Sequence, residues 1–498
     1  MSVVNTKTGK IEGYKEREML VFKGIPYAKP PTGELRFAPP VEVDPWSGTL
    51  NAENYKSCPY QGFSQLEEWF GKLQPESEDC LNLNIWTPAC DEQKRPVMVW
   101  IHGGAFITGG GINPAYEGLA LAKKGNMVVL TINYRLGAFG YLYIPGKTVN
   151  VGLLDQVMAL KWVRENIEHF GGDPDNITIF GESAGGYSVV SLPVVPAAKG
   201  LFHRVIAQSA PFIDPEVSDK NTKGFMRILK LKKDDLEGLR KISPEEIIAA
   251  QNTYMQKDPT NILAFRPIVD GKIIPKHPLK AFRNGECKNI DLMIGTNLDE
   301  AKLFTALEPT LNQMIEKGGE NALIMYMNTM NINKEHSKEI IETYRKARQG
   351  KLSVEPVELF DAILTDVMFR IPSIRLAEAQ SQHNENTYSY IFTYKSPQFD
   401  GKLGSPHAIE IPFVFNTLDN QNWGEFIHNG TMEQEISQKV MDAWIGFAHT
   451  GNPNNERLPQ WPRYDKKERA TMMLGNECEI INAPFDIERK AWKGLLKI

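Results

Sequence analysis

The chain lacks the features that mark several classes of protein. Its longest apolar runs have the length of a single strand, so we expect no transmembrane span and no membrane partner. Only five of its 498 residues are cysteine, and none of them forms a C-x-x-C pair, which gives no basis for a zinc or redox site. The residues after Met1 contain no basic region joined to an apolar core, so we expect no signal peptide and a cytoplasmic protein.

Charge of one sign is not concentrated anywhere in the chain. The net charge is −5, and acidic and basic residues are interleaved without the basic stripe that is typical of nucleic-acid binding. We therefore expect no nucleic-acid partner. The sequence also has no internal repeat, while 42% of its residues are hydrophobic. A chain of this length and composition can bury a large core without disulfides.

The first half of the chain contains an alternation of strand-like and helix-like segments. Residues 153–168 repeat apolar side chains at helical spacing, and short apolar runs lie on either side of them. These runs predict strands at 97–101, 127–133, 177–180 and 205–208. The alternation predicts an α/β fold, with a mostly parallel sheet and helices on both faces. An active site in such a sheet lies beyond the carboxyl ends of its strands.

The second half interrupts this pattern with helical insertions. Polar, helix-forming sequence at about 214–260 precedes a strand at 291–295, and a longer helical stretch covers about 308–394. We expect the second insertion to pack over the mouth of the active site. We predict an amphipathic helix at 436–450. We expect it to end at Gly451, because glycine is common just after the C-terminus of a helix.

A glycine-rich turn follows the strand at 177–180. Gly181-Glu182-Ser183-Ala184-Gly185 is a G-x-S-x-G motif, and small residues after it lead into a helix. In a strand–turn–helix context the serine lies at the apex of a sharp turn, where a Cβ on either glycine would collide with neighbouring backbone. An ordinary glycine-rich turn is the alternative, and the preceding strand argues against it. We predict that Ser183 is a catalytic nucleophile.

A second glycine loop follows the strand at 97–101. It begins His102-Gly103-Gly104, and a loop of this type donates backbone N–H groups to an oxyanion hole, together with the residue after the nucleophile. We predict that the amides of Gly103, Gly104 and Ala184 form this hole. His102 is an alternative candidate for the catalytic base, although a histidine that opens such a loop more often braces it by hydrogen bonds.

Two longer stretches resemble the signatures of the type-B carboxylesterases, a family that includes cholinesterases and bacterial p-nitrobenzyl-type esterases. FGGDPDNITIFGESAG at 170–185 matches at every restricted position, and EDCLNLNIWTP at 78–88 departs only at Asn82, where the family usually has Tyr, Thr or Phe. The similarity runs over residues 22–474. It implies one α/β-hydrolase domain over 1–498, and a serine hydrolase that cleaves carboxylic esters through an acyl-enzyme. It also implies a small-molecule ester substrate and no metal or cofactor.

The resemblance also implies the other two members of a catalytic triad. The loop after the strand at 291–295 contains Asp299 and Glu300, and the family pattern makes Glu300 the acid and leaves Asp299 as the alternative. The family usually has glycine next, where this chain has Ala301. His407, followed by a carboxylate and Pro-Phe, resembles the catalytic-histidine segment of the family. Other histidines follow the acid in the chain, at His336, His383, His428 and His449.

Several further residues are expected to support this site. Ser209 is a candidate hydrogen-bond partner of Glu300, and Glu182 could place a water or carry charge into the pocket without acting as the base. Leu263 and Phe265 are the candidates for an acyl pocket. Trp69 lies where cholinesterases have a choline-stacking tryptophan, and an ordinary core or surface aromatic residue is the alternative.

Similarity to the family also suggests structural pairs. Arg36 with Glu78, and Arg135 with Asp155, resemble its buried ion pairs. Secreted members join the cysteines that correspond to Cys58 and Cys80 in a disulfide, whereas we expect thiols in a cytoplasmic chain. We expect a monomer.

The alternative from another functional class is a non-catalytic adhesion or binding protein, because relatives of this fold exist without the nucleophile. Ser183, both glycine loops and a candidate acid and base are all present here, which favours the enzyme. A lipase, an amidase and a carbamate hydrolase would use the same machinery.

Overall fold

A computed structural model of the chain describes residues 2–62, 73–211, 217–257 and 263–496. Its described strands form a single thirteen-stranded sheet that runs through the whole molecule. In chain order they are β1 (Ser2–Asn5), β2 (Lys10–Glu16), β3 (Met19–Pro26), β4 (Thr49–Asn51), β5 (Asn82–Thr87), β6 (Arg95–Ile101), β7 (Val128–Ile132), β8 (Gly172–Glu182), β9 (Arg204–Gln208), β10 (Asp291–Asn297), β11 (Thr387–Phe392), β12 (Ala470–Leu474) and β13 (Glu479–Asn482).

The middle of the sheet is parallel and its ends are antiparallel. The order is β1-β2-β3-β5-β7-β6-β8-β9-β10-β11-β12-β13, with β4 paired to β2. All neighbours from β7 to β12 are parallel, whereas β1, β3, β5 and β13 pair antiparallel with their neighbours. The carboxyl ends of β6, β8, β9, β10 and β11 therefore meet along one edge. The predicted α/β class with a mostly parallel sheet is confirmed.

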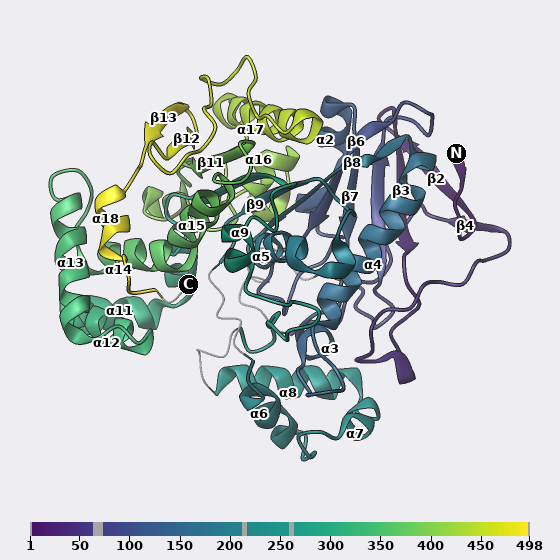
Figure 1. The fold of residues 1–498 in the computed structure, drawn as a ribbon, viewed down its shortest axis with the longest axis horizontal. Helices are drawn as coiled ribbons and strands as arrows, with labels where there is room; N and C mark the ends of the chain where they lie inside the picture. The colour runs from purple at the N-terminus through teal and green to yellow at the C-terminus, as the bar shows by residue number, and fades with distance from the viewer. Residues whose placement is uncertain (1, 63–72, 212–216, 258–262, 497–498) are drawn as a thin grey trace.

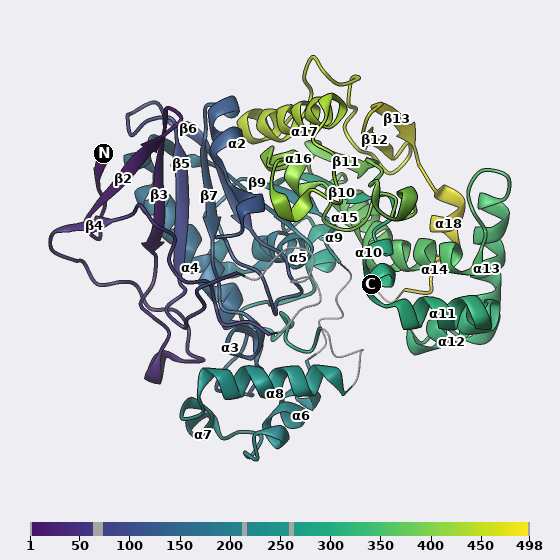
Figure 2. The same ribbon diagram turned by 180° about the vertical axis from the view of Figure 1, so that it is seen from behind.

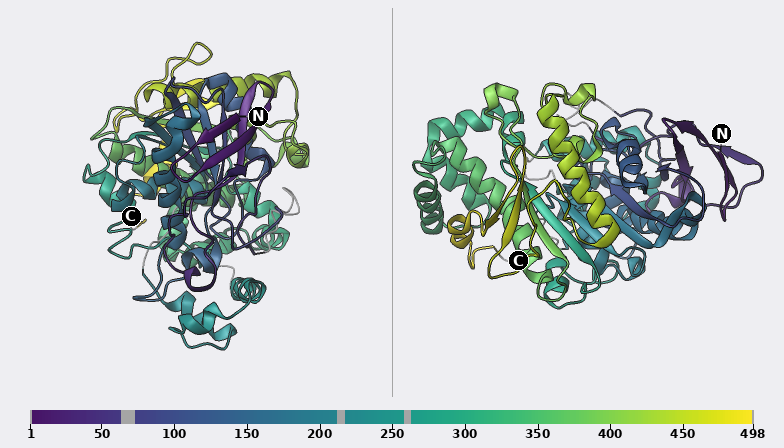
Figure 3. Two further views of the ribbon diagram at one scale, coloured as in Figure 1. Left: turned by 90° about the vertical axis from the view of Figure 1, so that its right-hand side faces the viewer. Right: turned by 90° about the horizontal axis from the view of Figure 1, so that it is seen from above.

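Helices cover both faces of this sheet, because its central strands are apolar on both sides. In β6, Val99 and Ile101 belong to one buried cluster and Trp100 belongs to the other. The first cluster packs under α4 (Val151–Asn166), α5 (Ala184–Ser191), α9 (Pro278–Arg283) and α15 (Ile371–Gln380). The second packs under α2 (Leu119–Gly125), α16 (Ile411–Phe415) and α17 (Thr431–Thr450). The view from above shows α17 lying along its face of the sheet (Figure 3).

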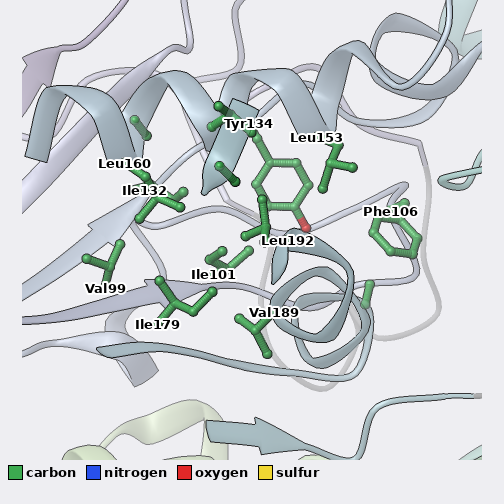
Figure 4. Packing of buried hydrophobic residues seen from close by; sticks show 14 of the residues in the cluster. Val99, Ile101, Phe106, Ile132, Tyr134, Leu153, Leu160, Ile179, Val189 and Leu192 are labelled. Atoms are coloured by element: carbon green, nitrogen blue, oxygen red, sulfur yellow. The ribbon is translucent and has the colours of Figure 1, made fainter. Parts of the chain in front are cut away.

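The larger cluster positions β8 and the helix that follows it. Ile179 of β8 and Val99 of β6 pack toward Leu160 of α4 and Val189 of α5 (Figure 4). All four side chains are fully buried, and complete burial of such a side chain stabilises the folded state by about 1.5–3 kcal/mol. The turn between β8 and α5 is thus held between two well-packed elements.

Two groups of helices, formed by separate stretches of the chain, extend from the sheet. The first contains α6 (Lys220–Ile228), α7 (Leu236–Arg240) and α8 (Pro244–Gln256), and it lies next to α3 (Gly137–Tyr141) at the bottom of Figure 1. The second contains α10 (Lys302–Leu307), α11 (Pro309–Gly318), α12 (Glu320–Thr329), α13 (Lys334–Arg348), α14 (Pro356–Thr365) and a π-helical turn at Asp366–Arg370. It has a buried cluster of its own, and α18 (Asp486–Ala491) packs on α13 (Figure 2).

The second insertion ends earlier than the sequence pattern predicts. Residues 387–392, which we expected to be part of a helical stretch to about 394, form β11 in the central sheet. All six side chains of this strand are buried, and β-branched and aromatic residues favour a buried strand. The other predicted strands and helices lie at their predicted places, with ends that differ by a few residues. Within the described residues, no helix combines the length and the apolar character needed to cross a membrane.

Candidate active site

Ser183 lies in a strained turn between β8 and α5. Its backbone has φ 56° and ψ −120°, a conformation that costs a residue other than glycine about 1–3 kcal/mol. The Ser183 N–H donates to the carbonyl oxygen of Gln208 at 3.0 Å, which holds the turn against β9. A Cβ on Gly185 would lie 1.9 Å from the carbonyl oxygen of Ile101, so only glycine lets the turn pack against the end of β6.

Glu300 and His407 lie together, although 107 positions separate them in the chain. The Nδ1–H of His407 donates to Glu300 Oε2 at 2.6 Å. The other carboxylate oxygen accepts from the Asn297 N–H at 2.7 Å and from the Ser209 hydroxyl at 2.5 Å. Glu300 is completely buried, so all of its hydrogen bonds are made to the protein. This arrangement fixes the orientation of the imidazole ring.

Asp299 holds the loop that carries His407 and does not contact the ring. Its Oδ2 accepts from the Ser405 N–H at 2.9 Å, and its own N–H donates to the Ser405 carbonyl oxygen at 2.9 Å. Ala301, where the family usually has glycine, has an ordinary helical conformation with φ −67°, so nothing in the backbone demands glycine there. The geometry therefore favours Glu300 over Asp299 as the partner of the histidine.

The other nitrogen of His407 faces a carboxylate. Nε2 lies 3.0 Å from Glu182 Oε1, an ion-pair contact that does not have the alignment of a hydrogen bond. Among the described residues, no hydrogen bond joins the Ser183 hydroxyl to His407. Glu182 is the residue directly before Ser183, so Nε2 of His407 faces the same turn as the candidate nucleophile.

Burial and charge act in opposite directions on the protonation of His407. Burial lowers the pKa of the imidazole, while the carboxylates of Glu182 and Glu300 raise it, and the net effect places the pKa well above its usual value. Burial also raises the pKa of Glu182, and the nearby His407 lowers it. In this arrangement the ring holds its proton more strongly than a free imidazole does.

The loop after β6 places backbone amides beside the serine. A Cβ on Gly103 would lie 2.8 Å from the Glu182 carbonyl oxygen and 3.1 Å from Ser183 Cβ, so this glycine is in direct contact with the nucleophile turn. Gly104 has φ +105°, a conformation that L side chains rarely adopt. Within the described chain, the N–H groups of Gly103, Gly104 and Ala184 donate to no other residue, which leaves them available to a substrate oxygen.

His102 braces this loop. Its Nδ1 lies 2.8 Å from the Gly103 carbonyl oxygen, and its ring stacks on Tyr134 at 4.5 Å between centroids. The Tyr134 hydroxyl in turn donates to the His102 carbonyl oxygen at 2.8 Å. Burial lowers the pKa of His102 to about 4, so the ring is neutral at physiological pH. These contacts favour the bracing role over that of a catalytic base.

A buried polar network behind the acid was not predicted from the sequence. Glu410 accepts from Gln208 Nε2 at 3.0 Å and from Asn297 Nδ2 at 2.7 Å, and Trp444 Nε1 donates to Gln208 Oε1 at 3.0 Å. Burial, followed by the nearby Glu182 and Glu300, raises the pKa of Glu410 to about 8. The sequence signal that could have revealed this network is that Gln208 and Asn297 are polar residues at the ends of buried strands.

Aromatic residues form one wall around the base. The rings of Phe304, at 5.2 Å, and Phe369, at 4.8 Å, lie against the imidazole of His407. Phe304 belongs to α10, and Phe369 belongs to the π-helical turn of the second insertion. Neither residue was singled out from the sequence, because their distance from His407 in the chain hides the contact.

Leu263 and Phe265, the predicted acyl-pocket residues, belong to the apolar core next to the first helical group. Phe265 is buried, and its ring contacts Phe225 at 5.5 Å and Tyr254 at 6.5 Å in the first helical group. Leu263 is half-buried against the same core. Their role in substrate binding stays a prediction, and Trp69 lies outside the described residues.

Both expected ion pairs are present. Arg36 Nε donates to Glu78 Oε1 at 2.6 Å, and Arg135 Nη2 donates to Asp155 Oδ1 at 2.7 Å. Cys58 and Cys80 are both buried, and the Cys58 thiol donates to the Pro75 carbonyl oxygen at 3.4 Å.

Comparison with known proteins agrees with this architecture. A family model described as the carboxylesterase family matches residues 1–492. The chain is 36% identical to the para-nitrobenzyl esterase of Bacillus subtilis strain 168, over 98% of each protein. It is 34% identical to the phenmedipham hydrolase of Pseudarthrobacter oxydans, over 95% of each.

Solved structures of the same kind superpose on nearly the whole chain. A PNB esterase structure matches with a TM-score of 0.86 and 35% identity, covering 98% of this chain and 99% of its own. A carboxylesterase from Geobacillus stearothermophilus matches with a TM-score of 0.86 and 36% identity, covering 99% and 100%. These matches confirm the α/β-hydrolase fold, and the protein belongs to the carboxylesterase family.

Proposed function

We propose that this protein hydrolyses carboxylic esters through an acyl-enzyme, with Ser183 as nucleophile, His407 as general base and Glu300 as the acid that orients it. The observation that carries the proposal is the 2.6 Å hydrogen bond between His407 Nδ1 and Glu300 Oε2, beside the strained turn of Ser183. A nucleophile, a base and an orienting acid are the three parts that acyl transfer by a serine requires.

Acylation begins when His407 Nε2 accepts the proton of Ser183, whose Oγ forms a bond to the ester carbonyl carbon. The carbonyl oxygen becomes an oxyanion, which the amides of Gly103, Gly104 and Ala184 stabilise. His407 then protonates the alcohol oxygen as the ester bond breaks. Water replaces the alcohol, gives a proton to the same nitrogen and attacks the acyl-enzyme. The carboxylic acid leaves, and Ser183 recovers its proton.

The first step requires two changes at His407. Its raised pKa means that the ring has to lose a proton before it can accept one from Ser183. Its Nε2 also has to leave Glu182 Oε1, which lies 3.0 Å away, for the serine hydroxyl. Catalytic hydrogen bonds often tighten only once a substrate is bound.

The substrate class we propose is a small ester with an apolar or aromatic group. Phe304 and Phe369 offer an aromatic wall next to the base, and Leu263 and Phe265 remain the candidates for an acyl pocket. A panel of p-nitrophenyl esters with acyl chains of increasing length tests this proposal. A maximum at one chain length is expected, whereas equal rates for all esters would contradict a defined acyl pocket.

The test of the catalytic assignment is Ser183→Ala, with Ser191→Ala as the matched control. Ser183 is half-buried and Ser191 is buried, but the Ser191 hydroxyl only donates to the Tyr187 carbonyl oxygen within α5. Hydrolysis of p-nitrophenyl acetate should fall by about 10⁴–10⁶ in Ser183→Ala and stay near the unmodified rate in Ser191→Ala. Near-normal turnover by folded Ser183→Ala would exclude Ser183 as the nucleophile, whereas no hydrolysis by the unmodified protein would favour a binding protein.

We also propose a monomeric, cytoplasmic enzyme whose 498 residues form one domain with two helical insertions. The state of Cys58 and Cys80 tests this location, because a reducing compartment keeps cysteines as thiols. Light scattering should give a mass near 56.2 kDa. After unfolding without reductant, protein from its native cells should expose both thiols to a thiol reagent. Protection that only reduction removes would contradict the cytoplasmic location.

A further inference from the structure

A small cavity lies between the sheet and the C-terminal part of the chain. Its volume is about 20 Å³, and it is lined from β10 by Thr296, from the second insertion and α15 by Arg370 and Ser373, and from the segment after α17 by Tyr464. On the same measure, about 10–15 Å³ is enough for one water molecule. The cavity therefore has room for a guest of roughly that size.

Five of the residues that line the cavity carry an unsatisfied polar atom. The ring of one of them, Tyr390, packs on Trp444 of α17, on the other face of the sheet, and four remain. Thr296 Oγ1, Arg370 Nε, Ser373 Oγ and the Tyr464 hydroxyl have no hydrogen-bond partner among the described residues. Each of the four residues is more than nine-tenths buried, so bulk water does not satisfy these atoms. Buried polar groups in native proteins normally have partners, and a guest in the cavity would supply one for several of them at once.

The charged side chains that line the cavity are all arginines. Arg370, Arg469 and Arg489 line it, whereas the described lining contains no aspartate or glutamate. The carboxylates that pair with these guanidinium groups, none of them in the described lining, are Asp366, Glu378 and Asp486. The cavity is thus positive on its inner surface, although the charges around it balance.

The hydrogen-bond donors and the volume of the cavity together indicate which ligand it can hold. An arginine Nε–H can only donate, and the three hydroxyl groups can all turn to donate, so an acceptor with no hydrogens of its own satisfies every atom. Guanidinium groups are weakly hydrated and readily bind anions. The small volume excludes phosphate or a carboxylate. We propose that this cavity binds one halide ion, which is chloride under cellular conditions.

The ion would stabilise the part of the sheet that leads to Glu300. Thr296 directly precedes Asn297, whose N–H donates to Glu300. Arg370 Nη2 donates to the Leu298 carbonyl oxygen at 2.6 Å, and its guanidinium lies 4.3 Å from the centre of the Phe485 ring. The bound ion therefore connects the strand that leads to the acid with the C-terminal segment. Its presence does not depend on the proposed reaction.

Crystals grown or soaked in bromide test the site directly. Anomalous diffraction should show one bromide in the cavity, within contact distance of Arg370 Nε and at least one of the three hydroxyl groups. In solution, the melting temperature should rise to saturation as chloride replaces gluconate at constant ionic strength. Water in the cavity without an anomalous signal, or equal melting temperatures in the two salts, would overturn the proposal.

Two variants attribute the chloride effect to this cavity. Ser373→Ala and Thr296→Val remove one hydroxyl group each, and both should reduce the chloride-dependent rise in melting temperature several-fold. Thr178→Val is the matched control, because Thr178 Oγ1 is also buried and unpartnered among the described residues but does not line the cavity. A chloride effect that is equal in all three variants would place the ion elsewhere, and the bromide experiment decides the case if a variant fails to fold.

Discussion

The two sides of the candidate active site are held in place by different means. On the nucleophile side the backbone decides the geometry: Ser183 has φ 56°, and glycines at 103 and 185 leave no room for a Cβ. On the base side, side chains decide it, because Glu300 accepts hydrogen bonds from three groups and so fixes His407. The backbone constraints involve residues that are close together in the chain, whereas the side-chain hydrogen bonds join segments that are far apart in it.

The difference predicts how each side responds to substitution. An added methyl group on the nucleophile side would overlap neighbouring backbone atoms. The loop then has to shift, and its amides lose their positions. On the base side, an isosteric change keeps the packing and alters only hydrogen bonding or charge. The variants below separate these two kinds of effect.

The largest effect is expected for Glu300→Gln. The amide can favour the wrong imidazole tautomer, and the analogous change in a serine protease lowers turnover by about 10⁴. Asp299→Asn is the control, because Asp299 contacts Ser405 and not His407. Turnover of p-nitrophenyl acetate by both folded variants checks the assignment. If Asp299→Asn is the inactive one, the third member of the triad is wrongly assigned.

Gly103→Ala should have the next largest effect. The new Cβ would lie 2.8 Å from the Glu182 carbonyl oxygen, so the loop has to move and its amides leave the oxyanion position. Loss of one such donor lowers kcat by about 10²–10³. Gly424→Ala is the control, since its Cβ would meet no described atom closer than 3.5 Å. Equal activity of the two variants would show that the loop after β6 does not bind the oxyanion.

Glu182→Gln should change the pH profile more than the maximal rate. Glu182 is one of the two carboxylates that raise the pKa of His407, so the neutral substitution lowers that pKa. The base must be neutral to act, and activity should therefore begin to rise at lower pH in the variant than in the unmodified enzyme. The pH dependence of kcat/KM measures this shift. A shift to higher pH, or none, would contradict the electrostatic role of Glu182.

Ser209→Ala should have the smallest effect. Its hydroxyl donates to Glu300 Oε1, but the Asn297 N–H still donates to the same oxygen after the substitution. Loss of one hydrogen bond of a network corresponds to about a two- to tenfold change in kcat. A loss as large as that of Glu300→Gln would show that Ser209 alone holds the acid in place.

Sequence reasoning predicted five of the thirteen described strands, all in the parallel middle of the sheet, and both glycine loops for a common physical reason. The strands at 97–101 and 177–180 are apolar on both faces, and the serine turn needs glycine within two residues of its apex. It placed residues 387–392 in a helical stretch because this strand is short and follows a run of helices. Local pattern gives little evidence about a strand whose stability comes from its neighbours in the sheet.

The sequence by itself determined the family, the α/β class and the candidate nucleophile, because the steric demands of a sharp turn and the apolar faces of a parallel sheet act over a few residues. Only the tertiary structure brought Glu300 and not Asp299 into contact with His407, placed Phe304 and Phe369 against the same ring, and placed Glu182 at its second nitrogen. These contacts join segments that are distant in the chain, and burial makes them strong because no water competes for the same hydrogen bonds.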